Sequence, residues 1–102
     1  NNGNHGMVRQ WQKIFYNNRF SASELTHHTP DYVKLAEAMG AVGLRMEQKS
    51  DVKDVFEKML EINDKPVLVD CVVDPDDMVF PMVPAGGSND VIILNEEDLK
   101  KI

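Results

Sequence analysis

The chain has 102 residues, 42% hydrophobic and 27% charged, with a net charge of −6 at neutral pH and a single cysteine. This is enough for one small globular domain, and no apolar run approaches the roughly 20 residues of a membrane span. The acidic balance and the scattered Lys and Arg exclude a nucleic-acid-binding protein, because phosphate contacts need clustered basic residues.

The first predicted element is a helix over residues 7–18. Its apolar residues recur at spacings that share one helix face: Met7, Trp11, Ile14 and Phe15. Asn17 and Asn18 prefer turns and are expected to end this helix. The polar residues 19–29 are predicted to be irregular.

A second helix is predicted to begin at Thr29, which serves as the cap, with Pro30 and Asp31 in the first turn. Gly40 is a typical helix stop. Residues 41–47 are expected to form a short strand. Ser50 is then predicted to cap a third helix that ends near Ile62.

Residues 66–74 form a run rich in β-branched side chains that does not alternate between polar and apolar. This pattern is typical of a strand that is buried on both faces of a parallel sheet. The order helix, strand, helix, strand predicts an α/β fold over residues 29–74. Residues 75–102 read as an extended tail, in which Glu96, Glu97 and Asp98 mark a solvated helix start.

Two strands are too few for a stable parallel sheet, because both edges and much of the core would be exposed. We therefore expect further strands upstream of Asn1, in a longer polypeptide.

The start of the chain carries the most specific pattern. Asn1-Asn2 is followed by a short loop, by Gly6-Met7-Val8, and by Gln10-Trp11-Gln12 and Phe15-Tyr16. This sequence resembles the C-terminal part of the thiamine diphosphate-binding domain of acetolactate synthase catalytic subunits. The resemblance continues through residues 30–43, 65–73 and 82–92.

The resemblance implies that residues 1–18 form a cofactor and lid segment. Asn2, through its side chain, and Asn4, through its main-chain carbonyl, would be ligands of Mg²⁺, which prefers oxygen. Asn2, Asn4, Gly6 and Met7 would lie against thiamine diphosphate. A simple Asn-rich turn is the alternative interpretation.

The resemblance also implies that Met7 and Trp11, one helical turn apart, line the pocket for the second 2-keto acid. Both residues could instead simply pack into a core. Residues 82–87 match a Met-Val-Pro-x-Gly-Gly stretch near the active-site channel in the family, and a flexible turn is equally compatible with them. No catalytic residue is predicted within the chain.

Other conspicuous residues favour structural roles. Asp70, inside a strand, is expected to make a structural hydrogen bond, and Cys71 is expected to be an inert buried thiol. His27 and His28 are expected to be solvated, because adjacent side chains diverge and no further ligand is suitably placed.

For the intact enzyme, the resemblance implies condensation of pyruvate with a second pyruvate or with 2-ketobutyrate in branched-chain amino acid biosynthesis. It implies the rest of the catalytic subunit as partner, a homodimer or homotetramer, a possible regulatory subunit, and FAD bound outside this chain. The location would be the cytoplasm, or a plastid or mitochondrion in a eukaryote.

The sequence lacks the family's Gly-Asp-Gly metal motif and its activating glutamate, so we expect the isolated chain to be inactive. Two other readings stay open. The chain could belong to another thiamine diphosphate enzyme, such as a catabolic acetolactate synthase or glyoxylate carboligase, or it could be a non-catalytic α/β interaction module.

Overall fold

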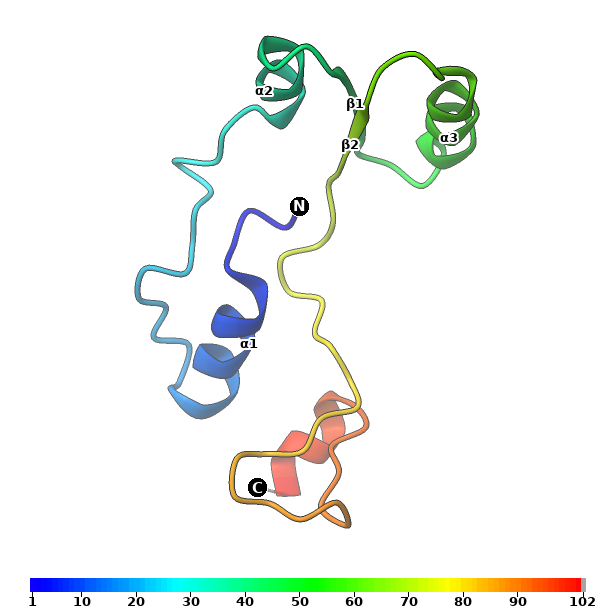
Figure 1. Cartoon of the computed structure of the whole chain (residues 1–102). Coiled ribbons are helices and arrows are strands. Elements are labelled where there is room, and N and C mark those ends of the chain that lie inside the picture. Colours follow the sequence, from blue (N-terminus) through cyan, green and yellow to red (C-terminus); the bar gives the residue numbers. More distant parts are fainter. Residues whose placement is uncertain (102) are drawn as a thin grey trace.

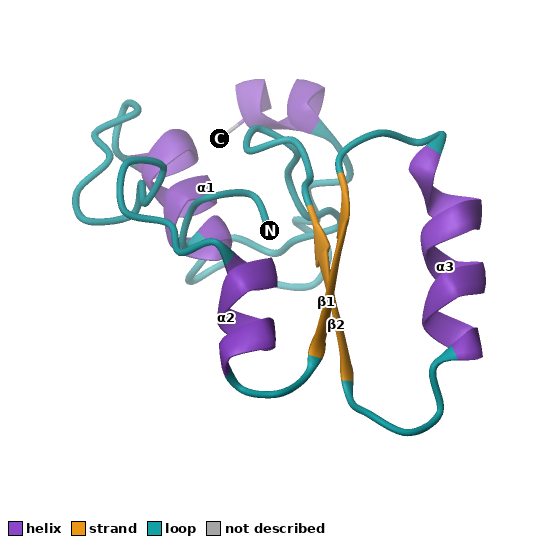
Figure 2. Cartoon of the chain, turned by 90° about the horizontal axis from the view of Figure 1, so that it is seen from above, coloured by secondary structure: helices purple, strands orange, loops and turns teal. Residues whose placement is uncertain are grey.

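A computed structural model describes residues 1–101 of the chain. Its elements are α1 (Gly6–Phe15), α2 (Tyr32–Ala38), β1 (Val42–Met46), α3 (Asp51–Glu61), β2 (Val67–Cys71) and the short 3-10 helix η1 (Glu96–Lys101). β1 and β2 form a parallel two-stranded sheet. Figure 2 shows α2 and α3 on opposite sides of this sheet. The predicted α/β class is therefore confirmed.

α2 packs closely against β1 at Gly43. A Cβ atom at Gly43 would lie 2.6 Å from the Val33 carbonyl oxygen and 2.7 Å from its Cα, so only glycine allows this approach. Ala36 of α2 is buried on this side of the sheet, and Leu44 and Met46 of β1 are buried on the opposite face, because they alternate with Gly43 along the strand and α3 packs there. These residues form the small core from which the C-terminal ends of both strands project.

The ends of α2 are set by local chemistry, with one difference from the prediction. Asp31 is the cap, because its carboxylate accepts a hydrogen bond from the Lys34 amide. Thr29 was predicted for this role, but its hydroxyl donates to the Leu25 carbonyl oxygen instead. Gly40 ends the helix as predicted: with φ of +81°, it allows the Gly40 and Ala41 amides to bond back to the last turn.

The other helices begin and end near the predicted residues. α1 stops at Phe15 rather than Asn18, because Asn17 and Asn18 both adopt left-handed backbone conformations. Ser50 does precede α3, but its side chain makes no capping bond. The Asp51 carboxylate accepts hydrogen bonds from the Glu47 and Gln48 amides, which lie before the helix.

β2 is shorter and less buried than predicted. It ends at Cys71 rather than Asp74, and within it only Asp70 is fully buried, while Leu68 is 37% exposed. The prediction of a strand buried on both faces is therefore wrong for this chain, because α3 packs on β1 and leaves part of β2 uncovered.

The chain is extended for its length (Figure 1). Its radius of gyration is 17.6 Å, whereas a compact domain of this size has about 13 Å. Its accessible surface is 7610 Å², against about 5,800 Å² for a compact protein of this mass. No helix among the described residues is long and apolar enough to cross a membrane.

We predict that Gly43→Ala lowers the free energy of unfolding of this α/β unit by about 1–3 kcal/mol, because the added methyl group must push α2 away from β1. Urea denaturation followed by circular dichroism measures the change. Gly40→Asn is the matched control: space there is open and Asn tolerates positive φ, so it should cost less. Equal losses for both variants would contradict the close-contact explanation.

Candidate functional site

The Asn-rich N-terminus is paired with the edge of β2 that faces away from β1. The Asn1 amino group donates to the Cys71 carbonyl oxygen at 2.7 Å, and the Val73 amide donates to the Asn1 carbonyl oxygen at 2.9 Å. The Val72 amide between them points the other way, to Met46 of β1. Asn1 thus extends the sheet like a third parallel strand, and the next residues leave from its edge.

A buried carboxylate fixes this arrangement. Asp70, 5% exposed, accepts hydrogen bonds from Asn1 Nδ2 at 2.9 Å and from Arg45 Nε at 3.2 Å. Arg45 also bonds to Asp31 at the start of α2, at 3.0 Å. The predicted structural role of Asp70 is confirmed: it ties the N-terminal segment to both strands and, through Arg45, to α2.

Asn2 and Asn4 form one turn immediately before α1. The Asn4 amide donates to Asn2 Oδ1 at 3.0 Å, and Asn4 Nδ2 donates to the Asn2 carbonyl oxygen at 2.6 Å. The Asn2 side chain lies against Gly6, where a Cβ atom would stand 2.9 Å from Asn2 Nδ2. The structure therefore brings together the three predicted residues Asn2, Asn4 and Gly6. A side chain at position 6 would clash with Asn2, which explains the glycine there.

This turn leaves polar groups available for a ligand. Asn4 Oδ1 is buried and has no hydrogen-bond partner among the described residues, a state that normally costs about 1–3 kcal/mol. α1 starts without a side-chain cap and without an acidic residue in its first turn. The first amides of a helix have no partner within it and attract anions. Neutral oxygens beside uncapped amides suit a metal-bound phosphate group.

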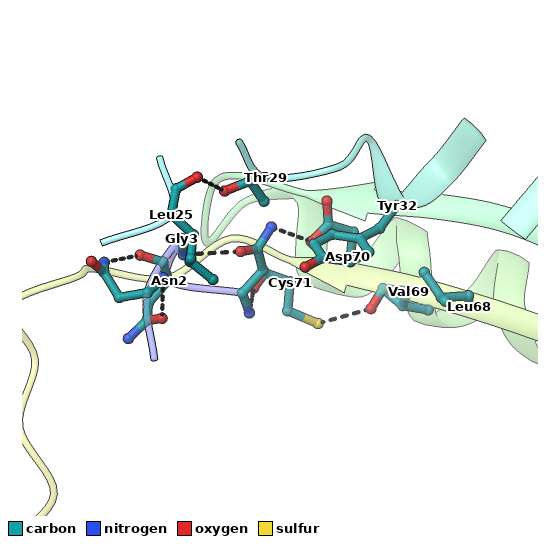
Figure 3. A pocket seen from close by; sticks show the side chains of 11 residues that line it. Asn2, Gly3, Leu25, Thr29, Tyr32, Leu68, Val69, Asp70 and Cys71 are labelled. Atoms are coloured by element: carbon teal, nitrogen blue, oxygen red, sulfur yellow. Dashed lines mark hydrogen bonds between the residues drawn. The ribbon is translucent and has the colours of Figure 1, made fainter. Parts of the chain in front are cut away.

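A cavity of about 500 Å³ adjoins the turn and the carboxyl end of β2. Figure 3 shows the side chains that line this cavity, which come from the N-terminal segment, from the loop before α2 and from β2. The lining residues are Asn1, Asn2, Gly3, Asn4, Leu25, Thr29, Tyr32, Leu68, Val69, Asp70 and Cys71. Ligands of open α/β sheets typically bind at this carboxyl end of the strands.

Trp11 lies at a second, smaller cavity of about 190 Å³, lined by Trp11, Phe15, Tyr16 and Ala85. The Trp11 and Phe15 rings contact each other, with centroids 5.2 Å apart. Ala85 belongs to the loop of residues 83–92, which contains Gly86 and Gly87 and is called the glycine-rich loop below, so this loop borders the same cavity as the aromatic residues of α1. Met7 is half exposed and lines neither of the two cavities.

The histidines and the cysteine differ in how well they match the prediction. His27 and His28 are exposed, as expected. Cys71 is only half-buried, contrary to the prediction of a buried thiol, because it lies at the open end of β2. No group of three or more His, Cys, Asp or Glu side chains that could hold a metal occurs within the described part of the chain.

Two polar residues that anchor α1 were not predicted from the sequence. Gln10 is buried and bonds to Val79 in the tail. Arg9 bonds to Asp76 at 2.8 Å and lies over the Phe20 ring, 4.5 Å from its centroid. Both are polar residues on an amphipathic helix, and their partners lie far away in the sequence, so helical spacing gave no signal for them.

Residues 1–71 match the family model described as "Thiamine pyrophosphate enzyme, C-terminal TPP binding domain". The chain belongs to this family. The expected ligand class, thiamine diphosphate (the same compound as thiamine pyrophosphate), therefore agrees with the name of the domain.

The chain is similar to catalytic subunits of acetolactate synthases. The acetolactate synthase large subunit of Mycobacterium tuberculosis is 56% identical over 95 residues, covering 90% of this chain and 15% of that protein. The large subunit of Corynebacterium glutamicum is 47% identical over 92 residues, covering 87% and 15%. The mitochondrial catalytic subunit of Aspergillus candidus is 37% identical over 101 residues, covering 98% and 14%. The chain thus spans about 15% of the length of these relatives.

We predict an acid-dependent release of α1 from the turn that carries Asp76. Hydrogen bonding from Arg9, followed by the charge of Lys13, holds the Asp76 pKa below its ordinary value of 3.8. The Asp76 pKa is lower in the folded chain than in the unfolded chain. The contact therefore stabilises the fold above pH 3.8, and this stabilisation is lost as the pH falls further. The fluorescence of Trp11, the single Trp of the chain, should report the release in an acid titration.

Asp76→Asn should remove this transition from the Trp11 signal. Asp51→Asn is the control: the pKa of Asp51 is also lowered, chiefly by the Glu47 amide, but Asp51 lies at the start of α3. A Trp11 transition that persists in Asp76→Asn, or disappears in Asp51→Asn, would contradict the assignment.

Proposed function

We propose that this chain supplies part of the thiamine diphosphate site of an acetolactate synthase catalytic subunit, a transferase. The observation that carries the proposal is the Asn2–Asn4 turn at the uncapped start of α1, found in a chain 56% identical to an acetolactate synthase. Residues 1–18 would be the cofactor and lid segment, residues 29–74 the α/β core, and residues 75–102 the tail.

Within this site, Asn2 would hold Mg²⁺ through its side-chain oxygen and Asn4 through its main-chain carbonyl oxygen. Asn2 Oδ1 already accepts the Asn4 amide, but a carbonyl oxygen has a second lone pair. The first amides of α1, at Gly6 and Met7, would face the diphosphate. Two neutral ligands do not complete a magnesium site, so a carboxylate from outside this chain would complete it.

The substrates would be 2-keto acids. Thiamine diphosphate, when bound, supplies an electron sink for decarboxylation of pyruvate. The residues of this chain would orient the second substrate, either pyruvate or 2-ketobutyrate. Trp11 would contact the extra methyl group of 2-ketobutyrate, which is worth about 1–3 kcal/mol, and Met7 would lie beside the cofactor. The contact of Trp11 with Phe15 and its cavity shared with Ala85 support this role.

The family resemblance implies the partners and the location of the enzyme. The partners would be the rest of the catalytic subunit, a second copy in a homodimer or homotetramer, and a possible regulatory subunit. FAD would bind outside this chain, and the pathway would be branched-chain amino acid biosynthesis. The enzyme would act in the cytoplasm of a prokaryote or in a plastid or mitochondrion.

The test is a chimera in which this chain replaces its 95-residue counterpart in the Mycobacterium tuberculosis large subunit. With Mg²⁺, thiamine diphosphate and FAD supplied, we expect the chimera to form acetolactate from pyruvate and the isolated chain to form none. Assays with pyruvate, 2-ketobutyrate and glyoxylate distinguish this function from that of glyoxylate carboligase. A chimera that folds but forms no acetolactate would overturn the proposal.

We further predict that Asn2→Ala in the chimera raises the Mg²⁺ concentration needed for half-maximal activity at least about tenfold, which corresponds to about 1.4 kcal/mol. The reason is the loss of one oxygen ligand. Asn63→Ala is the matched control, because Asn63 is exposed beyond α3 and bonds only to the Glu61 carbonyl oxygen. Equal Mg²⁺ dependence in both variants would show that Asn2 is not a ligand.

A further inference from the structure

The single buried residue among the ten of α1 is a glutamine, Gln10, which is 5% exposed. The Val79 amide donates to Gln10 Oε1 at 2.8 Å, and Gln10 Nε2 donates to the Val79 carbonyl oxygen at 3.1 Å. The side-chain amide therefore satisfies both backbone groups of Val79, as a neighbouring strand would. Buried polar groups need such partners, so this pair fixes the tail on α1.

The Gln10 side-chain amide also lies close to Met82, the residue that precedes the glycine-rich loop. Gln10 Nε2 also lies 3.4 Å from Met82 Sδ. Met82 pairs with Ile93 through two backbone hydrogen bonds of 2.9 and 2.8 Å, and Ile93 is 2% exposed. This pair closes the loop of residues 83–92, which carries Ala85. Gln10 thus holds the loop at its closed end.

Ala85 and Trp11 line the same cavity of about 190 Å³. Trp11 directly follows Gln10, and adjacent residues of a helix point in different directions. Gln10 can therefore bind the tail while Trp11 faces the loop that this tail carries. The distance between the indole and Ala85 depends on where Gln10 fixes Val79 and Met82.

We propose that Gln10 is a positioning residue that sets the width of the Trp11–Ala85 cavity and thereby selects the second 2-keto acid by size. This inference rests on the proposed function. Leucine and glutamate, which have similar length, cannot replace both hydrogen bonds: leucine makes neither bond to Val79, and glutamate lacks the donor for the Val79 carbonyl oxygen.

The test measures substrate selection in the chimera. In Gln10→Leu, we expect the ratio of kcat/KM for 2-ketobutyrate to kcat/KM for pyruvate to fall about tenfold, a typical effect of a poorly fitted methyl group. The loss should appear mainly in KM for 2-ketobutyrate, while kcat with pyruvate alone stays within about twofold, because Gln10 does not contact the cofactor turn.

Val79→Ala is the matched control. Val79 is 61% exposed, and Gln10 bonds to its backbone amide and carbonyl groups. This variant should keep the ratio of the unchanged chimera. An altered ratio in Val79→Ala would point to general loosening of the tail and would overturn the assignment to Gln10, and so would an unchanged ratio in Gln10→Leu.

A second measurement does not depend on activity. Trp11 is the single Trp of the chain, so acrylamide quenching of its fluorescence in the 102-residue chain reports its exposure. We expect quenching to rise at least about twofold in Gln10→Leu but not in Val79→Ala, because release of the loop uncovers the indole. If the unchanged chimera forms no acetolactate, the proposed function and its substrate selection fail, and quenching alone decides whether Gln10 places Trp11.

Discussion

The buried carboxylate of Asp70 is the constraint on which the rest of the site depends. It accepts hydrogen bonds from Asn1 and from Arg45, and Arg45 in turn bonds to Asp31 at the start of α2. A buried charge is stable only when it is paired and hydrogen-bonded, so Asn1 and Arg45 have to stay in place together. Asn2 and Asn4 follow Asn1 directly, and their position relative to the sheet is consequently fixed by a side chain 69 residues away from Asn1.

α1 is held by polar contacts rather than by an apolar core. Gln10 binds the tail, Gln12 binds the loop at Ser21 and Ser23, and Arg9 binds the turn at Asp76. The large apolar side chains of the same helix, including Met7 and Trp11, stay exposed to a considerable degree. This division suits a helix that presents apolar groups to a ligand, because directional hydrogen bonds fix its position while the apolar face stays free.

The sequence predicted those features that depend on neighbouring residues. Gly40 stops α2 because the turn needs positive φ, and β2 forms within a run of residues 66–74 that is rich in β-branched side chains. The cap of α2 was misplaced by two residues because Thr29, Pro30 and Asp31 all favour a helix start. In the structure Asp31 accepts hydrogen bonds from the Lys34 amide and from Arg45, whereas the Thr29 hydroxyl donates to the Leu25 carbonyl oxygen. The anchors Gln10 and Asp70 bond to groups 69 residues away, which no local pattern encodes. The roles of Asn2, Asn4 and Trp11 came from resemblance, since an Asn-rich turn and an aromatic helix face are individually common.

The neutral ligand set has a consequence for how the proposed cofactor would bind. Amide and carbonyl oxygens of Asn2 and Asn4 bring no negative charge, and the first turn of α1 contains no acidic residue. Mg²⁺ alone would gain little at this turn, because it is strongly hydrated and needs anionic oxygen ligands. A diphosphate alone would meet only the helix amides. Each ligand would therefore strengthen the binding of the other, and linkage requires that the two effects be equal in free energy. On the proposed function, the turn would respond to the metal and the cofactor as a pair and would discriminate against either one alone.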